Sequence, residues 1–341
     1  MKTSKAICFL VAAIVLTAWV ALPAAHAQQK TITLRYSTFF PASHKHAISS
    51  AEWCKQVEQR TNGRVKVQHF PGAQLTSPQT TYESVVKGVV DVGLCVLGYT
   101  MGKFPLSDIA AYPLGIPSGY LATVLSNEYY EKFKPAEFNQ IKVMYLQANG
   151  PGLIHTTKAV AKLEDMKGLK IRTFGPTTGF IANLGAAPVA MPMGEAYDAI
   201  SRGVADGIYS PYEVLLGFKI GEVVKYSIEN YGSSYSGVQL VAMNKAKWDG
   251  FPPDVQKTIE TINKEWIEIQ GKLWDEIDKE GKEFGLQKGI KIVKLSPEED
   301  KRWAEKAQPL INEYIKAMKD KGLPGEEVVK WYRDRLAAMK K

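Results

Sequence analysis

Cysteine is scarce in this chain. Its 341 residues include three cysteines, and one of them, Cys8, lies within an apolar N-terminal run. The other two, Cys54 and Cys95, can form a disulfide in an oxidising compartment or can be two small buried thiols. A chain of this length buries a large core and does not need a disulfide for stability, so two buried thiols are expected.

Long apolar runs are also few. The segment from Ala6 to Leu22 is the one long run; Lys2 and Lys5 precede it and Ala25-His26-Ala27 follows. This order is typical of a signal peptide, so residues 1–27 are predicted to be removed after Ala27 and the mature protein to be periplasmic. A membrane anchor is the alternative, but the run is short and no basic stop-transfer segment follows it.

The chain has no clustered basic stripe, although its formal net charge is +8. Its basic residues alternate with acidic ones through the C-terminal part, which favours a solvated surface over a nucleic-acid-binding one. With 45% apolar and 23% charged residues, the composition is that of a globular protein. No nucleic-acid partner is predicted.

Motifs for catalysis and cofactor binding are missing. The segment from Gly232 to Gly237 lacks the Gly-x-Ser-x-Gly spacing of a nucleophile elbow. The sequence contains no Walker loop, zinc-protease helix or dinucleotide fingerprint. His44-Lys45-His46 has no cysteine or acidic ligand near it in the sequence, so no metal site is expected. We therefore expect a non-enzyme without cofactor, and a periplasmic hydrolase stays an alternative that no motif supports.

A pattern that occurs twice is the most informative feature present. Tyr82 to Gly93 and Tyr197 to Gly207 each combine a helical segment ending on a basic residue, a glycine and an apolar run. The glycine suits the left-handed conformation that ends a helix, and the apolar run is typical of a strand. A helix leading into a strand, twice, predicts an α/β fold with two lobes and a cleft between them.

Hydrophobic periodicity predicts the elements around the first repeat: a strand at 31–37, a helix at 41–59, a strand at 65–70 and a helix at 79–87. This β-α-β-α-β order implies a largely parallel sheet. Ligands lie beyond the carboxyl ends of such strands. Phe40 and His44 follow the first strand, and Tyr99 follows the strand of the repeat.

The second lobe is predicted to begin at the turn-rich segment 149–152, which suits a hinge. A strand is expected at 168–172, followed by turn residues and a helix at 179–184. Arg172 thus ends a strand beside a helix N-terminus, a place where a guanidinium can pair with a carboxylate. A neighbouring acidic residue is the alternative partner for this arginine.

The segment 252–284 carries apolar residues at helical spacing: Val255, Ile259, Ile262, Trp266, Ile269, Leu273 and Ile277. A helix of this length spans roughly 45 Å, longer than one small lobe needs, so it is expected to cross both. A further helix is predicted from Ser296-Pro297 through Met318. The expected division is 28–149 and 238–277 for lobe I, 150–237 and 278–325 for lobe II, and 326–341 for a solvated C-terminal tail or helix.

Several collinear motifs resemble one known family. They are Phe70-Pro71-Gly72-Ala73-Gln74-Leu75, Gly88-Val89-Val90-Asp91, Gly168-Leu169-Lys170-Ile171-Arg172, Glu195-Ala196-Tyr197 and Gly203-Val204-Ala205-Asp206-Gly207. In this order and spacing they are similar to the solute-binding proteins of tripartite ATP-independent periplasmic (TRAP) transporters. The resemblance covers nearly all of the predicted mature chain.

The resemblance implies a two-lobed periplasmic binding protein fold, spanned by a long helix, that closes on a small organic acid. It implies delivery of the acid to the small and large permease subunits of an ion-gradient-driven transporter. Because the receptor must open and close, it is expected to be a monomer. In that family the arginine matching Arg172 pairs with the ligand carboxylate. A sensor-coupled binding protein is the alternative that the sequence does not separate from a transport receptor.

The chain departs from the family pattern at two positions. Many sugar-acid and dicarboxylate binders have a second arginine near the position of Ile154 and an asparagine near that of Ser210. Their absence here favours a singly charged ligand, either a monocarboxylate with an aromatic or apolar body or a sulfonate. The residues expected to bind it are Arg172, Phe174, Tyr209, Ser210, Tyr212, His155, Phe40, His44 and Tyr99.

Overall fold

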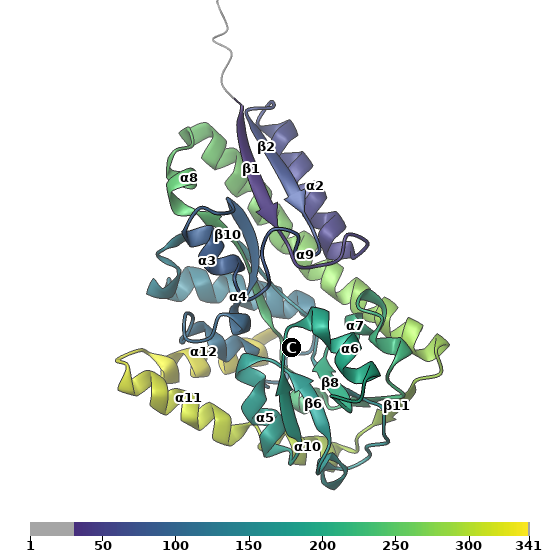
Figure 1. Cartoon of the computed structure of the whole chain (residues 1–341). Coiled ribbons are helices and arrows are strands. Elements are labelled where there is room, and N and C mark those ends of the chain that lie inside the picture. Colours follow the sequence, from purple (N-terminus) through teal and green to yellow (C-terminus); the bar gives the residue numbers. More distant parts are fainter. Residues whose placement is uncertain (1–30, 340–341) are drawn as a thin grey trace, which may run out of the picture.

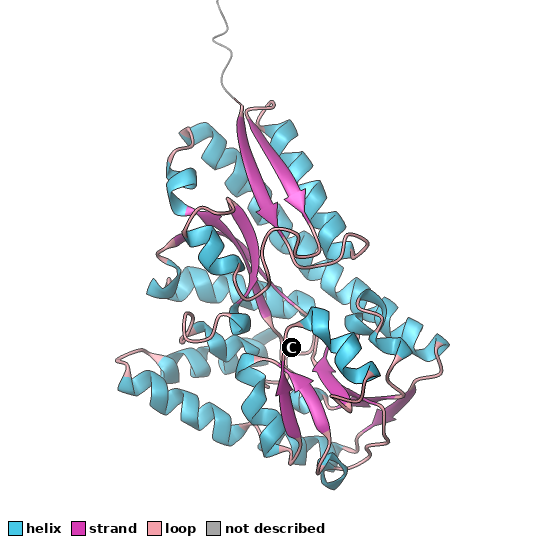
Figure 2. Ribbon diagram, in the orientation of Figure 1, coloured by secondary structure: helices cyan, strands magenta, loops and turns pink. Residues whose placement is uncertain are grey.

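The computed structural model describes residues 31–339 and contains two β-sheets, one above the other in Figure 1, with helices around both. The predicted signal peptide, residues 1–27, lies outside the described residues. We call the part built on the five-stranded sheet lobe I and the part built on the six-stranded sheet lobe II. Figure 2 shows that helices cover both sheets, which confirms the α/β class.

The sheet of lobe I has the order β2-β1-β3-β10-β4. Its strands are β1 (Ile32–Ser37), β2 (Val65–Phe70), β3 (Val92–Val96), β4 (Ile141–Ala148) and β10 (Val238–Asn244). β1 is parallel to β2 and β3, as the β-α-β-α-β order predicts. β10 is antiparallel to both β3 and β4, so the sheet is mixed. β10 enters from a segment far along the sequence, which local periodicity does not reveal.

The sheet of lobe II has the order β11-β9-β5-β8-β6-β7. Its strands are β5 (Leu153–Thr156), β6 (Lys170–Thr173), β7 (Ala187–Ala190), β8 (Gly207–Ser210), β9 (Tyr226–Glu229) and β11 (Lys291–Lys294). β6 lies parallel to β7 and β8, so the carboxyl ends of these strands meet at one edge. That edge faces lobe I.

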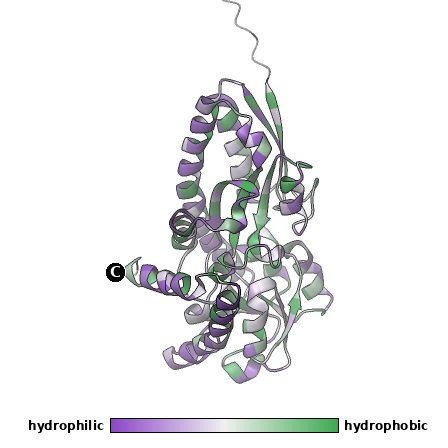
Figure 3. Ribbon diagram, turned by 90° about the vertical axis from the view of Figure 1, so that its left-hand side faces the viewer, coloured by the Kyte–Doolittle hydropathy of each residue, from purple (hydrophilic) through white to green (hydrophobic). Residues whose placement is uncertain are grey.

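The helices are α2 (Lys45–Arg60), α3 (Thr81–Val86), α4 (Gly119–Phe133), α5 (Thr178–Asn183), α6 (Ala196–Ser201), α7 (Glu213–Gly217), α8 (Lys245–Asp249), α9 (Pro253–Gln287), α10 (Pro297–Glu305), α11 (Gln308–Asp320) and α12 (Gly325–Met339). In Figure 3 the strands are mostly coloured as hydrophobic, whereas the helices carry hydrophilic and hydrophobic residues side by side. This is the pattern of helices that bury one face.

The two repeats adopt the same local structure, which confirms the prediction. α3 and α6 are each followed by a glycine with a positive φ, Gly88 and Gly203, before the strand begins. The aspartate that follows each glycine binds the neighbouring strand. Asp91 accepts the backbone N–H of Arg35 at 2.7 Å, and Asp206 accepts that of Lys170 at 2.9 Å. Each repeat therefore uses its carboxylate to join strand to strand.

The long helix α9 crosses both lobes, as predicted. It packs on α2, α4 and β4 of lobe I and on α7 of lobe II (Figure 1). Its apolar stripe follows the prediction up to Trp266 and again at Leu273 and Ile277, and Gln270 and Trp274 join the buried face. Ile269 is exposed, so its predicted place on the buried stripe is wrong.

The C-terminal part differs from the expectation in two ways. The single helix predicted from Pro297 to Met318 is two helices, α10 and α11, with Pro309 in the first turn of the second. Proline lacks the N–H that a continuous helix needs, which explains the break. α12 is not a fully solvated end, because Tyr332 and Leu336 are buried and Arg335 pairs with Glu128 of α4.

Cys54 and Cys95 are free and buried, as expected from the composition. Burial raises the pKa of both thiols, so they stay protonated and unreactive. Within residues 31–339, no helix has the length and apolar character that a membrane span requires.

The hydrogen bond between Asp91 and the backbone of Arg35 can be tested by measuring the free energy of unfolding. Asp91→Ala leaves the Arg35 N–H without its carboxylate acceptor in a buried position, so we expect a loss of about 1–3 kcal/mol of unfolding free energy. Asp91→Asn keeps an oxygen acceptor and should cost less. Urea unfolding measures both. Asp249→Ala removes an exposed carboxylate paired only to Lys245 and is the control, expected to change stability by less than about 0.5 kcal/mol. Equal effects of Asp91→Ala and Asp249→Ala would contradict this account.

Candidate functional site

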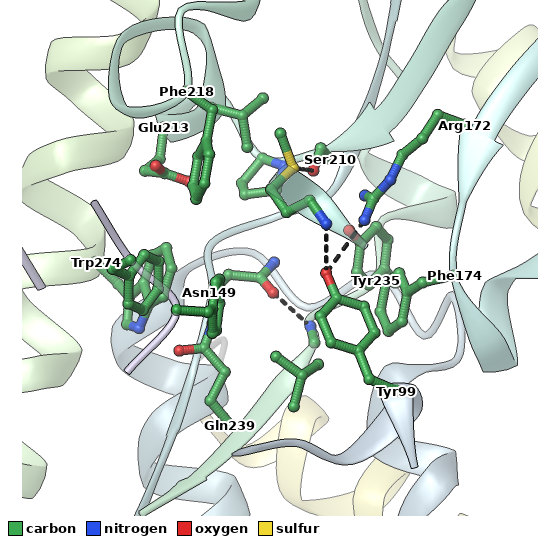
Figure 4. A pocket seen from close by; sticks show the side chains of 17 residues that line it. Tyr99, Asn149, Arg172, Phe174, Ser210, Glu213, Phe218, Tyr235, Gln239 and Trp274 are labelled. Atoms are coloured by element: carbon green, nitrogen blue, oxygen red, sulfur yellow. Dashed lines mark hydrogen bonds between the residues drawn. The ribbon is translucent and has the colours of Figure 1, made fainter. Parts of the chain in front are cut away.

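A cavity lies at the junction of the two lobes, where the carboxyl ends of β3, β6 and β8 approach one another (Figure 4). Its volume is about 50 Å³. It is lined by Phe39, Phe40, Val96, Tyr99, Asn149, Arg172, Phe174, Met193, Ser210, Pro211, Glu213, Val214, Phe218, Tyr235, Gly237, Gln239 and Trp274. Residues of both lobes and of α9 therefore share one site.

Arg172 is the only lysine or arginine among the described residues that line this cavity. It stands near the end of β6 and is 2% exposed. Its Nε and Nη2 donate to the Met191 carbonyl at 3.1 and 2.8 Å, and Nη2 also donates to Tyr99 Oη at 3.2 Å. Nη1 has no acceptor in residues 31–339. The guanidinium is thus held in place by the protein while one of its nitrogens stays available for a ligand oxygen.

Tyr99 extends the polar end of the cavity. Its hydroxyl accepts hydrogen bonds from Arg172 Nη2 and from the backbone N–H of Met193, at 3.2 and 3.1 Å. Because both lone pairs of the oxygen are used, the hydroxyl proton is free to be donated. Arg172 and Tyr99 together therefore offer donors to an anionic oxygen.

Six aromatic side chains form a large part of the remaining wall. Phe174 makes an edge contact with Tyr99 at a centroid distance of 5.8 Å, and Phe39 stacks on Phe40 at 4.3 Å. Phe218, Tyr235 and Trp274 complete this surface. Gly98 is required beside it, because a Cβ there would come within 2.6 Å of the Phe174 ring. Such a wall suits a flat apolar body.

The lobe junction itself supplies two amides. Asn149 Oδ1 accepts the backbone N–H of Gly237 at 2.8 Å, which ties together the two chain segments that connect the lobes. The backbone N–H of Gly152 donates to the Tyr235 carbonyl at 2.8 Å in the same place, and a side chain at Gly152 would overlap the Tyr235 ring. Gln239 Oε1 accepts from Gln147 at 2.7 Å, so its amide nitrogen is left for the cavity.

Glu213 is the acidic residue of the cavity. It begins α7 in lobe II, and its Oε1 lies 2.6 Å from Nε2 of His44, which begins α2 in lobe I. The contact crosses from one lobe to the other. His44 also stacks on Phe40 at 4.4 Å and packs against Phe218 of lobe II. These contacts hold the lobes together beside the cavity.

Five of the nine side chains predicted to bind ligand line the cavity: Phe40, Tyr99, Arg172, Phe174 and Ser210. His44 lies next to it through Glu213. The structure places the other three elsewhere. Tyr209 is buried and donates to the Ser233 carbonyl. Tyr212 donates to Glu229 at 3.2 Å.

His155 belongs to the core of lobe II. Its ring nitrogens contact Ser227 Oγ at 2.8 Å and the Ser210 carbonyl at 3.0 Å. Burial lowers the pKa of this histidine to about 4, so it stays neutral. It supports the strand that carries Ser210 and does not reach the cavity. Residues on one strand alternate between its two faces, which separates Tyr209 from its neighbour Ser210 in the cavity.

Sequence reasoning missed Glu213, Trp274, Gln239 and Asn149 as site residues. Glu213 follows β8 by three positions, so the rule that ligands lie beyond strand ends could have found it. Trp274 could not be found in this way, because it belongs to α9 and was one position off the predicted stripe. Gln239 lies on β10, whose partners in the sheet are far away in sequence.

A metal centre finds no support in the described part of the chain. No group of three or more histidine, cysteine, aspartate or glutamate side chains there is arranged to hold an ion. His44 and His46, which head α2, instead contact Glu213 and Gln270, each at 2.6 Å.

Comparison with known proteins places the chain in a family. Residues 36–317 match the family model described as bacterial extracellular solute-binding protein, family 7. Among curated proteins, the outer membrane transporter protein TsaT of Comamonas testosteroni is 26% identical over 323 residues, which cover 93% of this chain and 95% of that protein.

Solved structures with this fold include TRAP solute-binding proteins that hold aromatic acids. One from a marine metagenome, specific for aromatic acid ligands and in complex with metahydroxyphenylacetate, is 29% identical, with a TM-score of 0.86 and coverage of 91% of this chain and 100% of that one. One from Rhodoferax ferrireducens T118, in complex with copurified benzoate, is 28% identical, with a TM-score of 0.85 and coverage of 90% and 98%. The chain therefore belongs to the bacterial extracellular solute-binding proteins of family 7, the solute receptors of TRAP transporters.

Proposed function

We propose that this receptor captures an aromatic monocarboxylate between its lobes and delivers it to the membrane permease of a TRAP transporter. The observation that carries this proposal is a single guanidinium, that of Arg172, at one end of a cavity that is also lined by seven aromatic side chains. The carboxylate would meet Arg172 Nη1 and the Tyr99 hydroxyl, while the ring would pack between Phe174, Phe39 and Trp274. A sulfonate presents similar oxygens and is the neighbouring ligand class.

The charge of the cavity supports one anionic group per ligand. A second carboxylate would find no lysine or arginine among the described lining residues, and it would meet Glu213 instead. Burying an unpaired carboxylate is costly, so dicarboxylates would bind poorly. The relatives with metahydroxyphenylacetate and benzoate are consistent with this ligand class.

The size of the cavity supports a receptor that opens and closes. Its volume of about 50 Å³ is well below the roughly 150 Å³ of an apolar protein cavity that holds benzene. An aromatic acid therefore needs the lobes to move apart before it enters. The proposed hinge lies at Asn149–Gly152 and Tyr235–Gly237, with α9 as a third connection, and the proposed lobes are 28–149 with 238–277 and 150–237 with 278–325.

The family supports a proposal about the cellular setting. We propose export by the predicted signal peptide with cleavage after Ala27, function as a monomer in the periplasm, and contact with both the small and the large permease subunit.

The hydrolase alternative gains nothing from the geometry. The neighbour of Ser210 Oγ, the serine of the cavity, is Met193 Sδ at 3.9 Å and not a histidine. The serine–histidine pair formed by Ser227 and His155 is buried away from the cavity. A nucleophile needs both an adjacent base and access to substrate.

A thermal-shift screen tests the ligand class. Benzoate, phenylacetate and benzenesulfonate are expected to raise the unfolding midpoint, because a ligand at about 100 times its Kd stabilises the folded state by about 2.7 kcal/mol. This corresponds to a shift of roughly 5 °C or more. Succinate and glucuronate, with two charges or a polar body, should give little shift. A shift with succinate or glucuronate and none with any aromatic acid would contradict the proposal.

A further inference from the structure

Glu213 is an unexpected residue for an anion receptor, because it brings a carboxylate to the cavity that binds an acid. It is 3% exposed, and it stands three positions after β8 at the start of α7. Figure 4 shows it on the side of the cavity opposite Arg172, next to Phe218. The two charged side chains therefore face the same space from different ends.

His44 holds one oxygen of the Glu213 carboxylate through a hydrogen bond. His44 Nδ1 accepts the backbone N–H of His46 at 3.2 Å, so this ring nitrogen carries no proton. The single ring proton is then on Nε2, which donates to Glu213 Oε1 at 2.6 Å. His44 therefore orients Glu213 through its Oε1 atom.

The second oxygen of Glu213 is unused by the protein. Throughout residues 31–339, no side chain or backbone group donates to Oε2, and no lysine or arginine comes within ion-pair distance of the carboxylate. A nearly buried carboxylate oxygen without a donor is unfavourable unless water or a ligand supplies one. Glu213 lines the cavity, so a ligand that displaces water from it can supply that donor.

We propose that Glu213 sets the specificity of the receptor by accepting a hydrogen bond from a hydroxyl or amino group at the end of the ligand remote from its carboxylate. The same charge repels a second carboxylate at that end. The ligand is then an aromatic acid with an anionic group for Arg172 and a donor group for Glu213. This inference rests on the proposed function and narrows its ligand class.

Calorimetric titration of matched ring acids tests the inference. The ligands are benzoate, the meta and para hydroxybenzoates, the fluorobenzoates of the same pattern and the corresponding benzenedicarboxylates. Fluorine is close to a hydroxyl in size but donates nothing. For the wild-type protein we expect one hydroxybenzoate isomer to bind about 10- to 100-fold more tightly than its fluoro counterpart, because a hydrogen bond to a charged group has about that effect. The benzenedicarboxylates should bind more weakly than benzoate.

Glu213→Gln should remove both effects together. The amide oxygen can still accept from His44 Nε2, so the contact between the lobes is kept while the charge is lost. We expect the hydroxy-to-fluoro ratio to fall by about tenfold and dicarboxylate affinity to rise by a similar factor, with benzoate affinity within about threefold. Glu229→Gln is the matched control, since Glu229 is a largely buried carboxylate of lobe II that does not line the cavity.

The outcomes distinguish a wrong role for Glu213 from a wrong ligand class for the receptor. Benzoate binding with the same ligand ratios in wild type, Glu213→Gln and Glu229→Gln would overturn the role of Glu213 alone. Failure of every ring acid to bind the wild type would overturn the proposed ligand class, and this inference with it. If Glu213→Gln does not fold, the hydroxy-to-fluoro ratio of the wild type decides, because a ratio near one contradicts the inference.

Discussion

Replacement of Arg172 by alanine is expected to weaken binding of an aromatic monocarboxylate by about 2–4 kcal/mol, a loss of thirtyfold or more. The guanidinium is the only cationic group among the described residues that line the cavity, and its Nη1 has no protein acceptor there. The cavity is small, so a carboxylate left without its cation would be poorly resolvated. Isothermal titration of the wild type and the variant measures the difference.

Two further variants show which property of the Arg172 side chain the ligand needs. Arg172→Lys keeps the charge but lacks the planar fork that also binds the Met191 carbonyl, so it should recover only part of the affinity. Arg202→Ala removes an exposed arginine of the same lobe and should leave affinity unchanged. A folded Arg172→Ala protein with wild-type affinity would contradict the role given to this residue.

Saturating ligand is expected to close the lobes and make the protein more compact. The His44→Ala variant is expected to favour the form in which the lobes are apart. In the closed arrangement His44 of lobe I donates to Glu213 of lobe II and packs against Phe218. Losing a hydrogen bond to a charged group costs about 1.5–3 kcal/mol, so the ratio of closed to open protein should fall by about 10- to 100-fold. Because apparent affinity scales with the competent fraction, binding should weaken accordingly.

Small-angle scattering measures closure of the lobes directly. The wild type should show a smaller radius of gyration with benzoate than without it. Arg172→Ala at the same benzoate concentration is the control, because it should stay unliganded and unchanged. Equal radii for the free and the saturated wild type would rule out hinge closure, whatever the affinity of His44→Ala.

Much of the fold could be predicted because its signals are local. The two repeats place a glycine with positive φ between helix and strand, and both appear in the structure at Gly88 and Gly203. Ser296 caps α10 by accepting the Glu299 N–H, as its position before Pro297 predicts. Arg172 was found for the same reason, since the end of a strand beside a helix can be located from sequence pattern alone.

The predictions differ from the structure where the burial of a side chain depends on packing between distant segments. Ile269 was placed on the buried stripe of α9, but it is exposed, and the helix presents Gln270 and Trp274 to its neighbours as well as Leu273 and Ile277. Straight helices drift from a strict repeat, and packing against two lobes decides which face is buried. Tyr209, Tyr212 and His155 were expected at the ligand because they lie near it in sequence, although their side chains enter the core of lobe II.

The sequence by itself determined the family, the α/β class, the long helix across both lobes and the arginine of the cavity, because motif order, hydrophobic period and turn residues are properties of short segments. Only the tertiary structure decided the rest of the site. Glu213 meets His44, and Trp274 meets Phe40, across long stretches of chain. Whether two such side chains share a cavity depends on how the lobes pack, and no local pattern contains that information.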